Sequence, residues 1–414
     1  MNKKTCVVSC PIDTYSGYGA RSRDFVKGLV KAKGDVWDIK ILSQRWGNLP
    51  FGYLNDHSEF DLASRTVSQL TSRPDIWMQI TIPSEFQNVG QHYNIGITAG
   101  IESSLCDEKW VEGINRMDET IVSSEHAKEV FNSNPKLKPT KPIKVLFEGL
   151  DLDKYWKTDS KGAVEINTSL DSIKESFAFL FVGHWIERKN VTNLVHTFYR
   201  AFANNKKMPA LILKTQQQSN AIADRTRIDR VVRDIRNSFP PDFELPKVYV
   251  IQGDLSDAEV NELYNHPKVK AMVNLTRGEG FGRPLLEFCA VGKPIIAPLW
   301  SGQKDFLNRN FIVPVPGALR PIPKQYTNDW IIEGGQWYES NLDIAGQKML
   351  EVWKNYSKFT TKAKQQQKYA TSKFSMDKMN EKIVEYMETV DKAVPEKVEL
   401  ALPKLQLPKL QKIG

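Results

Sequence analysis

Two glutamates flank a glycine-rich turn in the second half of the chain. Glu279 and Glu287 are separated by seven residues, and a helix is expected to begin near Pro284, between them. Glycines let a backbone approach a ligand closely, and a helix N-terminus presents unpaired N–H groups to a phosphate. The pattern predicts a phosphate-binding turn with Glu279 facing a cleft and Glu287 about one turn into the helix. The glycines of this turn are Gly278, Gly280 and Gly282.

Two cations occupy a second turn, which follows the apolar run Phe177–Val182. Such a run is typical of a central parallel strand buried on both faces. Arg188 and Lys189 come after it, just before the helix expected over Val191–Ala203. Fixed cations at this position suit an anionic ligand.

A third turn lies near the N-terminus. The segment Ser16–Ser22 follows the strand expected over Thr5–Ser9 and opens the helix expected over Ser22–Ala32. In parallel α/β sheets, ligands bind at the carboxyl ends of the strands. Gly17 and Gly19 are therefore candidates for contact with a phosphate, although a Gly-x-Gly segment can also be a simple tight turn.

Together the three turns resemble retaining GT-B glycosyltransferases, most closely glycosyltransferase family four. The stretch Thr276–Ala297 is similar to the Glu-x7-Glu motif of that family. Phe181–Asn190 is similar to its Gly-Arg…Lys-Gly segment, although His184 stands where the family has arginine. The resemblance covers about residues 5–390 and is strongest over 178–310. It implies an α/β protein of the GT-B class, with two Rossmann-like doubly wound lobes and a donor cleft between them.

The resemblance also implies residue roles. Glu279, Arg188 and Lys189 are the expected catalytic residues, with the glutamate at the donor sugar and the two cations on the pyrophosphate. Glu287 is expected to bind the ribose of the donor. The other candidates are Gly17, Gly19, His184, Gly280, Phe281, Gly282 and Arg283 on the donor side, and Tyr18 and Glu102 on the acceptor side.

No metal site is expected. The Asp151-Leu-Asp153 pair is interpreted as part of the segment that ends the first lobe in this family, rather than as a metal-binding pair. No cofactor is expected either, because the nucleoside diphosphate sugar is a co-substrate.

The alternation of strands and helices divides the chain into two α/β lobes. We expect an N-terminal Rossmann-like acceptor lobe over 1–156, a linker over 157–174 and a Rossmann-like donor-binding lobe over 175–370. A helix over 371–392 is expected to cross back onto the first lobe. The tail over 393–414 repeats the pentad Leu-Pro-Lys-Leu-Gln, and it is either a frayed end or a peptide that docks on a protein partner.

Composition constrains the compartment and the partners. The chain has 414 residues, four scattered cysteines and a formal net charge of +8 at pH 7. Those cysteines suit neither a disulfide framework nor a zinc site, and no apolar run approaches the roughly 20 residues that span a bilayer. We therefore expect a cytoplasmic protein, in a bacterial host if a phage encodes it. The positive charge favours an anionic partner.

The expected reaction is transfer of a hexose or pentose from a nucleoside diphosphate sugar, a UDP-sugar, to a hydroxyl, with retention of configuration. The segments Trp77–Phe86 and Thr98–Glu102 are similar to glycosyltransferases of large tailed phages, some of which modify hydroxymethylated bases in DNA. Duplex DNA is therefore one expected acceptor. The alternative is a lipopolysaccharide or polysaccharide at an anionic membrane surface. A non-catalytic protein that binds nucleotide sugars is a third possibility.

Overall fold

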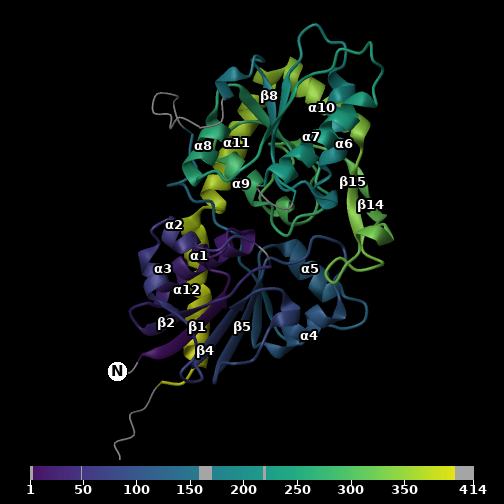
Figure 1. Ribbon diagram of the computed structural model, residues 1–414. Coiled ribbons are helices and arrows are strands. Elements are labelled where there is room, and N and C mark those ends of the chain that lie inside the picture. The colour runs from purple at the N-terminus through teal and green to yellow at the C-terminus, as the bar shows by residue number, and fades with distance from the viewer. Residues whose placement is uncertain (1–2, 48, 158–169, 218–220, 397–414) are drawn as a thin grey trace, which may run out of the picture.

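Two parallel sheets form the centres of two α/β lobes, which lie one above the other (Figure 1). The computed structural model describes residues 3–47, 49–157, 170–217 and 221–396. The N-terminal sheet contains, in spatial order, β3 (Thr66–Val67), β2 (Trp37–Ser43), β1 (Lys4–Cys10), β4 (Ile76–Ile80), β5 (Tyr93–Thr98), β6 (Glu119–Val122) and β7 (Ile143–Val145). The order reverses beside β1, where doubly wound sheets bind ligands.

The C-terminal sheet repeats this plan. It contains, in spatial order, β10 (Val248–Ile251), β9 (Ala210–Lys214), β8 (Ala178–Val182), β11 (Val269–Val273), β12 (Ile295–Ala297) and β13 (Val313–Pro314). All its described pairings are parallel. The sequence Ala-Phe-Leu-Phe-Val of β8 is apolar throughout because helices cover both faces of a parallel sheet. The chain therefore has the expected fold class, two doubly wound Rossmann-like lobes.

Helices connect the strands within each lobe. Those of the N-terminal lobe are α1 (Gly17–Lys33), α2 (Tyr53–Asp56), α3 (Phe60–Ser64), α4 (Glu108–Arg116) and α5 (Glu125–Ser133). Those of the C-terminal lobe are α6 (Val191–Phe202), α7 (Ile222–Asn237), α8 (Asp257–Asn265), α9 (Arg283–Cys289), α10 (Leu342–Lys354) and α11 (Tyr356–Lys373). The last helix, α12 (Met376–Ala393), follows α11 and does not connect two strands.

Two features differ from the sequence-based expectation. First, α1 begins at Gly17 and not at Ser22, because the side chain of Ser16 accepts a hydrogen bond from the Gly19 N–H at 2.8 Å and caps the helix there. The glycine-rich segment is thus the first turn of the helix. Second, an unexpected antiparallel hairpin, β14 (Gly317–Pro321) and β15 (Gln336–Ser340), projects from the C-terminal lobe (Figure 1).

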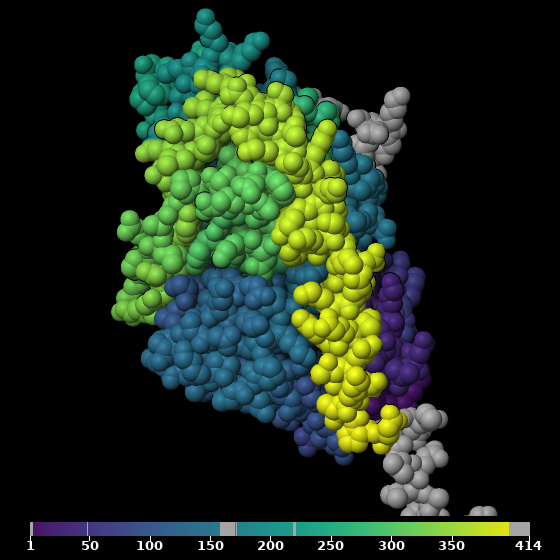
Figure 2. All heavy atoms as spheres, turned by 180° about the vertical axis from the view of Figure 1, so that it is seen from behind, coloured from purple at the N-terminus to yellow at the C-terminus, as the bar shows by residue number. Residues whose placement is uncertain are grey.

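Helix α12 crosses from the C-terminal lobe onto the N-terminal lobe and lies along its back (Figure 2). At the crossing, Leu150 exchanges two backbone hydrogen bonds with the α11–α12 junction, at 2.7 Å to the Phe374 carbonyl and 2.8 Å from the Met376 N–H. The helix then packs against α1. The last residues of the helix therefore form part of the first lobe.

A carboxylate near the end of α12 fixes it to three elements of the first lobe. Asp391 accepts hydrogen bonds from Lys4 of β1 at 2.9 Å, Lys33 of α1 at 3.1 Å and the Trp37 indole of β2 at 2.9 Å. Partial burial by itself raises the pKa of Asp391, but these donors outweigh it and lower the pKa to about 2.

Part of the expected organisation lies outside the described residues. Most of the expected linker (158–169) and the repeat that closes the tail (397–414) are among them. Over the residues that the structure does describe, none of the helices combines the length and the apolar character that crossing a bilayer requires.

Replacing Asp391 with asparagine is expected to lower the free energy of unfolding at pH 7 by about 1 kcal/mol, because three donors lose a charged acceptor at a partly exposed site. The folded pKa of Asp391 lies below its ordinary value of 3.8, so this stabilisation is present above that pH and is lost as the pH falls toward 2. Urea unfolding at about pH 7 and pH 3 measures both effects. The exposed Glu388→Gln on the same helix is the control, and equal stability of Asp391→Asn and wild type at pH 7 would contradict the prediction.

Candidate functional site

Four turns at the carboxyl ends of parallel strands meet between the lobes. The N-terminal lobe contributes the start of α1, after β1, and the segment 99–102, after β5. The C-terminal lobe contributes 183–189, after β8, and 274–282, after β11. They border a cavity of about 570 Å³, the inter-lobe cavity. The expected site residues that line it are Gly17, Tyr18, Glu102, His184, Lys189, Glu279, Gly280, Phe281, Gly282, Arg283 and Glu287.

Two of the expected site residues do not line this cavity. Gly19 faces the interior of the first lobe, where a Cβ atom would lie 2.2 Å from the Thr14 carbonyl oxygen. Packing accounts for its lack of a side chain, and the geometry gives no support to a phosphate contact at Gly19. Arg188 lies beside the cavity, joined to residues that do line it.

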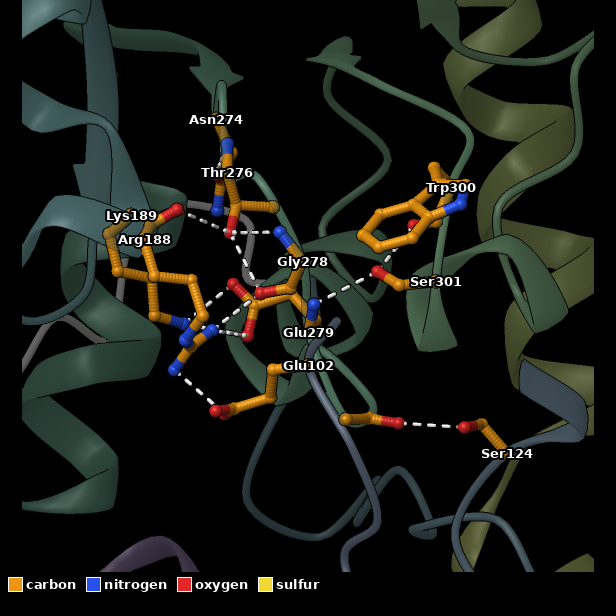
Figure 3. A network of polar contacts seen from close by, with 11 residues as sticks. Glu102, Ser124, Arg188, Lys189, Asn274, Thr276, Gly278, Glu279, Trp300 and Ser301 are labelled. Carbon is orange, nitrogen blue, oxygen red and sulfur yellow. Dashed lines mark hydrogen bonds and ion pairs between the residues drawn. The ribbon is translucent and has the colours of Figure 1, made fainter. Parts of the chain in front are cut away.

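Glu279 is the centre of a buried ion-pair network (Figure 3). The Nζ of Lys189 lies 2.6 and 2.7 Å from its two carboxylate oxygens, and Nη1 of Arg188 lies 3.4 Å from one of them. The second terminal nitrogen of Arg188 reaches across to Glu102 of the first lobe at 2.7 Å. A Ser301 hydroxyl accepts a hydrogen bond from the Glu279 N–H at 2.9 Å, which fixes the backbone. The network joins two carboxylates and two cations from both lobes.

The charges of this network follow from its pairing. Burial raises the pKa of Glu279, but Lys189 and Arg188 outweigh it and bring the pKa below its ordinary value. Burial lowers the pKa of Lys189, against the opposing effect of Glu279. His184 is exposed at the cavity, but partial desolvation there and the neighbouring cations Lys189 and Arg188 lower its pKa, so the imidazole is neutral at pH 7. His184 therefore does not replace the positive charge of the arginine that it stands for in the resemblance.

Glycines in the turn after β11 allow the two lobes to touch. A Cβ atom on Gly278 would lie 2.0 Å from the Glu102 carbonyl oxygen, and one on Gly280 would lie 2.9 Å from the Ala99 carbonyl oxygen. The Gly280 carbonyl also accepts a hydrogen bond from Ser124 of the first lobe at 2.8 Å (Figure 3). The sequence pattern predicted close approach of this backbone to a ligand, and the structure shows close approach to the other lobe.

A second network surrounds Arg283, the first residue of α9. Its guanidinium lies 2.7 Å from Asp24 of α1, 3.6 Å from Glu148 and 3.1 Å from Glu287. Tyr264 donates a hydrogen bond to the other oxygen of Glu287 at 3.1 Å. Three carboxylates therefore share one guanidinium.

Burial changes the protonation of this second network. Burial raises the pKa of Glu287 to about 7, although Arg283 and Tyr264 act against it. Burial also raises the pKa of Glu148. At pH 7 the carboxyl of Glu287 is therefore close to half protonated.

Sequence reasoning missed two members of this network, Asp24 and Glu148. Asp24 lies within a helix, without a motif to mark it. Glu148 belongs to a segment whose pattern indicates only the end of the first lobe. Their place beside Arg283 depends on how the lobes pack, which local spacing does not indicate.

The Asp151-Leu-Asp153 pair lies in a turn. Among the described residues, no three or more His, Cys, Asp and Glu side chains gather closely enough to hold a metal ion. The Asp151 side chain instead accepts a hydrogen bond from the Asp153 N–H at 3.0 Å, which closes a turn.

Comparisons with known proteins identify the fold. No protein-family profile and no curated protein sequence matches this chain. Solved structures do match along nearly its full length. A glycosyltransferase from Rickettsia africae has a TM-score of 0.67 at 14% identity, with 95% of this chain and 100% of that one covered.

Two further structures agree. Sucrose-phosphate synthase from Thermosynechococcus elongatus has a TM-score of 0.64 at 14% identity, covering 95% of this chain and all of that one. Anabaena HepE in complex with UDP-glucose has a TM-score of 0.63 at 13% identity, covering 93% and 99%. Together with the two doubly wound sheets, these similarities show that the chain has the GT-B fold.

The protonation of Glu287 can be measured through stability. The folded pKa of about 7 lies above the ordinary value of 4.5, so the stabilisation due to its protonated form is complete below pH 4.5 and is lost as the pH rises through 7. Relative to Glu287→Gln, the wild-type protein is therefore expected to lose roughly 3 kcal/mol over this range. Thermal unfolding of both proteins across these pH values tests this. If the stabilities of the wild type and Glu287→Gln change in parallel with pH, Glu287 does not take up a proton in this range.

Proposed function

We propose that this protein transfers a sugar from a UDP-sugar to a hydroxyl group with retention of configuration. The observation that best supports this proposal is the pairing of Glu279 with Lys189 and Arg188 beside a cavity that both lobes line. The GT-B fold, shared with a structure that holds UDP-glucose, supports a nucleotide sugar as the ligand.

Binding of the donor would require the cations of the site to leave their carboxylate partners and pair with the diphosphate. Lys189 and Arg188 are the cations that suit its diphosphate, but in the structure both are paired with carboxylates. A diphosphate therefore competes for them with Glu279 and Glu102. As Lys189 turns to the diphosphate, Glu279 is freed to accept hydrogen bonds from the hydroxyls of the donor sugar.

Glu287 suits the ribose of the donor. It lines the cavity at the start of α9, and its carboxylate accepts hydrogen bonds from Arg283 and Tyr264. A ribose hydroxyl can donate a further hydrogen bond to this carboxylate. Because the pKa of Glu287 is about 7, this carboxyl is partly protonated at neutral pH and repels the incoming diphosphate less than a fully ionised carboxylate would.

The transfer step needs little proton chemistry from the protein. In the front-face mechanism that accompanies retention, the acceptor oxygen attacks the anomeric carbon on the side from which the diphosphate leaves, and the departing phosphate takes the hydroxyl proton. Lys189 and Arg188 stabilise the charge that develops on the leaving group. Glu279 orients the sugar.

A hydroxymethylated base in duplex DNA is the proposed acceptor, because the segments Trp77–Phe86 and Thr98–Glu102 resemble phage glycosyltransferases that modify such bases. The net charge of +8 is compatible with a polyanionic acceptor. The excess of positive charge does not surround the inter-lobe cavity, whose charged lining is more acidic than basic. Instead, α11 carries five exposed lysines and no acidic residue: Lys358, Lys362, Lys364, Lys368 and Lys373. This helix is the surface on which phosphates would be held.

The roles of Glu279 and Lys189 predict opposite effects on donor binding. Glu279→Gln removes a competitor of the diphosphate, so UDP should bind about fivefold more tightly, while transfer falls by more than about a hundredfold. Lys189→Ala should weaken UDP binding and abolish transfer. Titration calorimetry with UDP and transfer from radiolabelled UDP-sugars measure the two properties separately.

Lys348→Ala, on α10 and paired with Glu351, is the control for the lysine variant. Weaker UDP binding by Glu279→Gln would refute the competition between Glu279 and the diphosphate for Lys189 and Arg188. A loss of transfer below about tenfold in either variant would refute its catalytic role. A wild-type protein that binds UDP but neither transfers nor hydrolyses any UDP-sugar would be a non-catalytic binding protein.

Duplex DNA should bind at low salt, with log K falling by roughly four or more units per unit of log salt concentration. Replacing the α11 lysines 358, 362, 364 and 368 with glutamine should weaken this binding and reduce the slope, by up to about one for each phosphate that is no longer neutralised. UDP binding should not change. Fluorescence anisotropy of labelled DNA over a salt series is the measurement.

Transfer itself decides the acceptor class. Hydroxymethylated DNA and an extract of lipid and polysaccharide are offered with the same UDP-sugars. Transfer to the extract and none to the DNA would refute the DNA acceptor and favour the membrane alternative.

A further inference from the structure

A second cavity adjoins the inter-lobe cavity on the side of the first lobe. It has a volume of about 620 Å³ and is called the side cavity below. Six residues line both cavities: Tyr18, Trp46, Leu49, Ala99, Glu102 and Gly280. Two ligands bound in the two cavities would therefore meet beside Glu102.

The walls of the side cavity are mainly aromatic and aliphatic. The ring of Trp46 stacks on that of Tyr18, with centroids 4.1 Å apart and planes 23° apart. The other apolar lining residues are Leu49, Ile82, Ile101, Trp110, Trp330 and Ile331. Such walls suit a flat apolar ring, which stacks on indole with little loss of hydrogen bonds.

Several of the polar groups in these walls already have partners. The Tyr18 hydroxyl lies 2.9 Å from the Thr98 hydroxyl and accepts a hydrogen bond from the Ala99 N–H at 3.2 Å. Glu102 is paired with Arg188, and Glu85 accepts a hydrogen bond from Thr81. A saccharide has a hydroxyl on nearly every carbon, and burying these hydroxyls without partners is costly. Arg45 also lines the cavity, and its guanidinium carbon lies 5.5 Å from the centroid of the Phe51 ring. The mainly aromatic and aliphatic walls therefore favour a planar ring that stacks on indole and carries few hydroxyls.

One wall of the side cavity comes from the opposite lobe. The hairpin β14–β15 reaches the first lobe, where Gln336 and Ser104 form two hydrogen bonds, at 3.1 Å from the Ser104 N–H to the Gln336 carbonyl and at 2.9 Å from the Gln336 N–H to the Ser104 hydroxyl. These bonds hold the connecting segment of the hairpin so that Trp330 and Ile331 line the cavity. The indole of Trp330 is 47% exposed.

We propose that the side cavity binds the acceptor through a planar aromatic ring that carries the reacting hydroxyl, and that Trp330 determines this specificity by stacking on the ring. The proposal rests on the proposed sugar transfer. In that reaction the acceptor oxygen bonds to the anomeric carbon, the bond from that carbon to the diphosphate breaks, and the hydroxyl proton moves to the diphosphate. Once the diphosphate has taken Arg188 from it, Glu102 at the junction of the cavities accepts a hydrogen bond from the hydroxyl and directs it toward the donor.

Binding of small probes tests the ring preference without requiring transfer. The probes are 4-nitrobenzyl alcohol, 5-hydroxymethyl-2′-deoxycytidine and methyl α-glucoside, added to the full-length protein and followed by saturation-transfer NMR. The two aromatic alcohols are expected to bind, and Trp330→Ala should weaken their binding by about tenfold while Trp330→Phe retains it. Binding of the nucleoside alone would identify a hydroxymethylated base, and binding of both would identify aromatic alcohols in general.

Trp156→Ala is a matched control, because Trp156 is also 47% exposed and lines neither cavity. It should leave binding of the aromatic probes unchanged. Binding of methyl α-glucoside without the aromatic probes would overturn the proposal, as would unchanged affinity in Trp330→Ala.

Calorimetry with UDP separates this proposal from the proposed function. Trp330→Ala should bind UDP as the wild type does, and its KM for an aromatic acceptor should rise while its KM for the donor stays the same. A wild-type protein that binds the aromatic probes through Trp330 but does not bind UDP would refute the proposed function and leave the aromatic site established.

Discussion

The two lobes are held in register by two partly buried arginines, each of which is paired with carboxylates of both lobes. These pairs are Arg188 with Glu102 and Glu279, and Arg283 with Asp24 and Glu287. A buried guanidinium is strongly destabilising unless carboxylates neutralise it. Separating or rotating the lobes would leave both arginines without the carboxylate partners that the first lobe supplies. The approach of the lobes, and with it the shape of the cavity between them, therefore depends on these pairs.

The same charges underlie the proposed chemistry. Lys189 and Arg188 are the cations proposed to bind a diphosphate, and in the structure they neutralise Glu279. An anionic ligand must replace one set of pairs with another, so the free energy of binding is the difference between two sets of charge-assisted hydrogen bonds. Binding of such a ligand is consequently coupled to the contact between the lobes, because Arg188 takes part in the ion-pair network of the site and also in the contact with Glu102 of the first lobe.

Two connections bridge the lobes away from the arginines. Helix α12 crosses at Leu150 and is tied to the first lobe, while the hairpin β14–β15 crosses at Ser104 on the other side of the view in Figure 1. The hairpin places Trp330 against a cavity whose other walls come mainly from the first lobe. Under the proposal, acceptor selection would thus be shared between the lobes.

Local patterns in the amino-acid sequence were enough to predict the two doubly wound lobes, because alternating apolar strands and amphipathic helices are local features. They also predicted Glu279, Lys189 and Glu287 as site residues from short motifs next to predicted strand ends, and all three line the inter-lobe cavity. The hairpin was not predicted, since β14 is exposed along its whole length and has no alternating pattern. The packing of the lobes was needed to show that Arg283 meets Asp24, that glycines of the second lobe touch backbone of the first, and that Trp330 reaches the side cavity. Each of these contacts joins residues far apart in the chain, and their geometry is set by how two separately folded lobes pack, which no local spacing encodes.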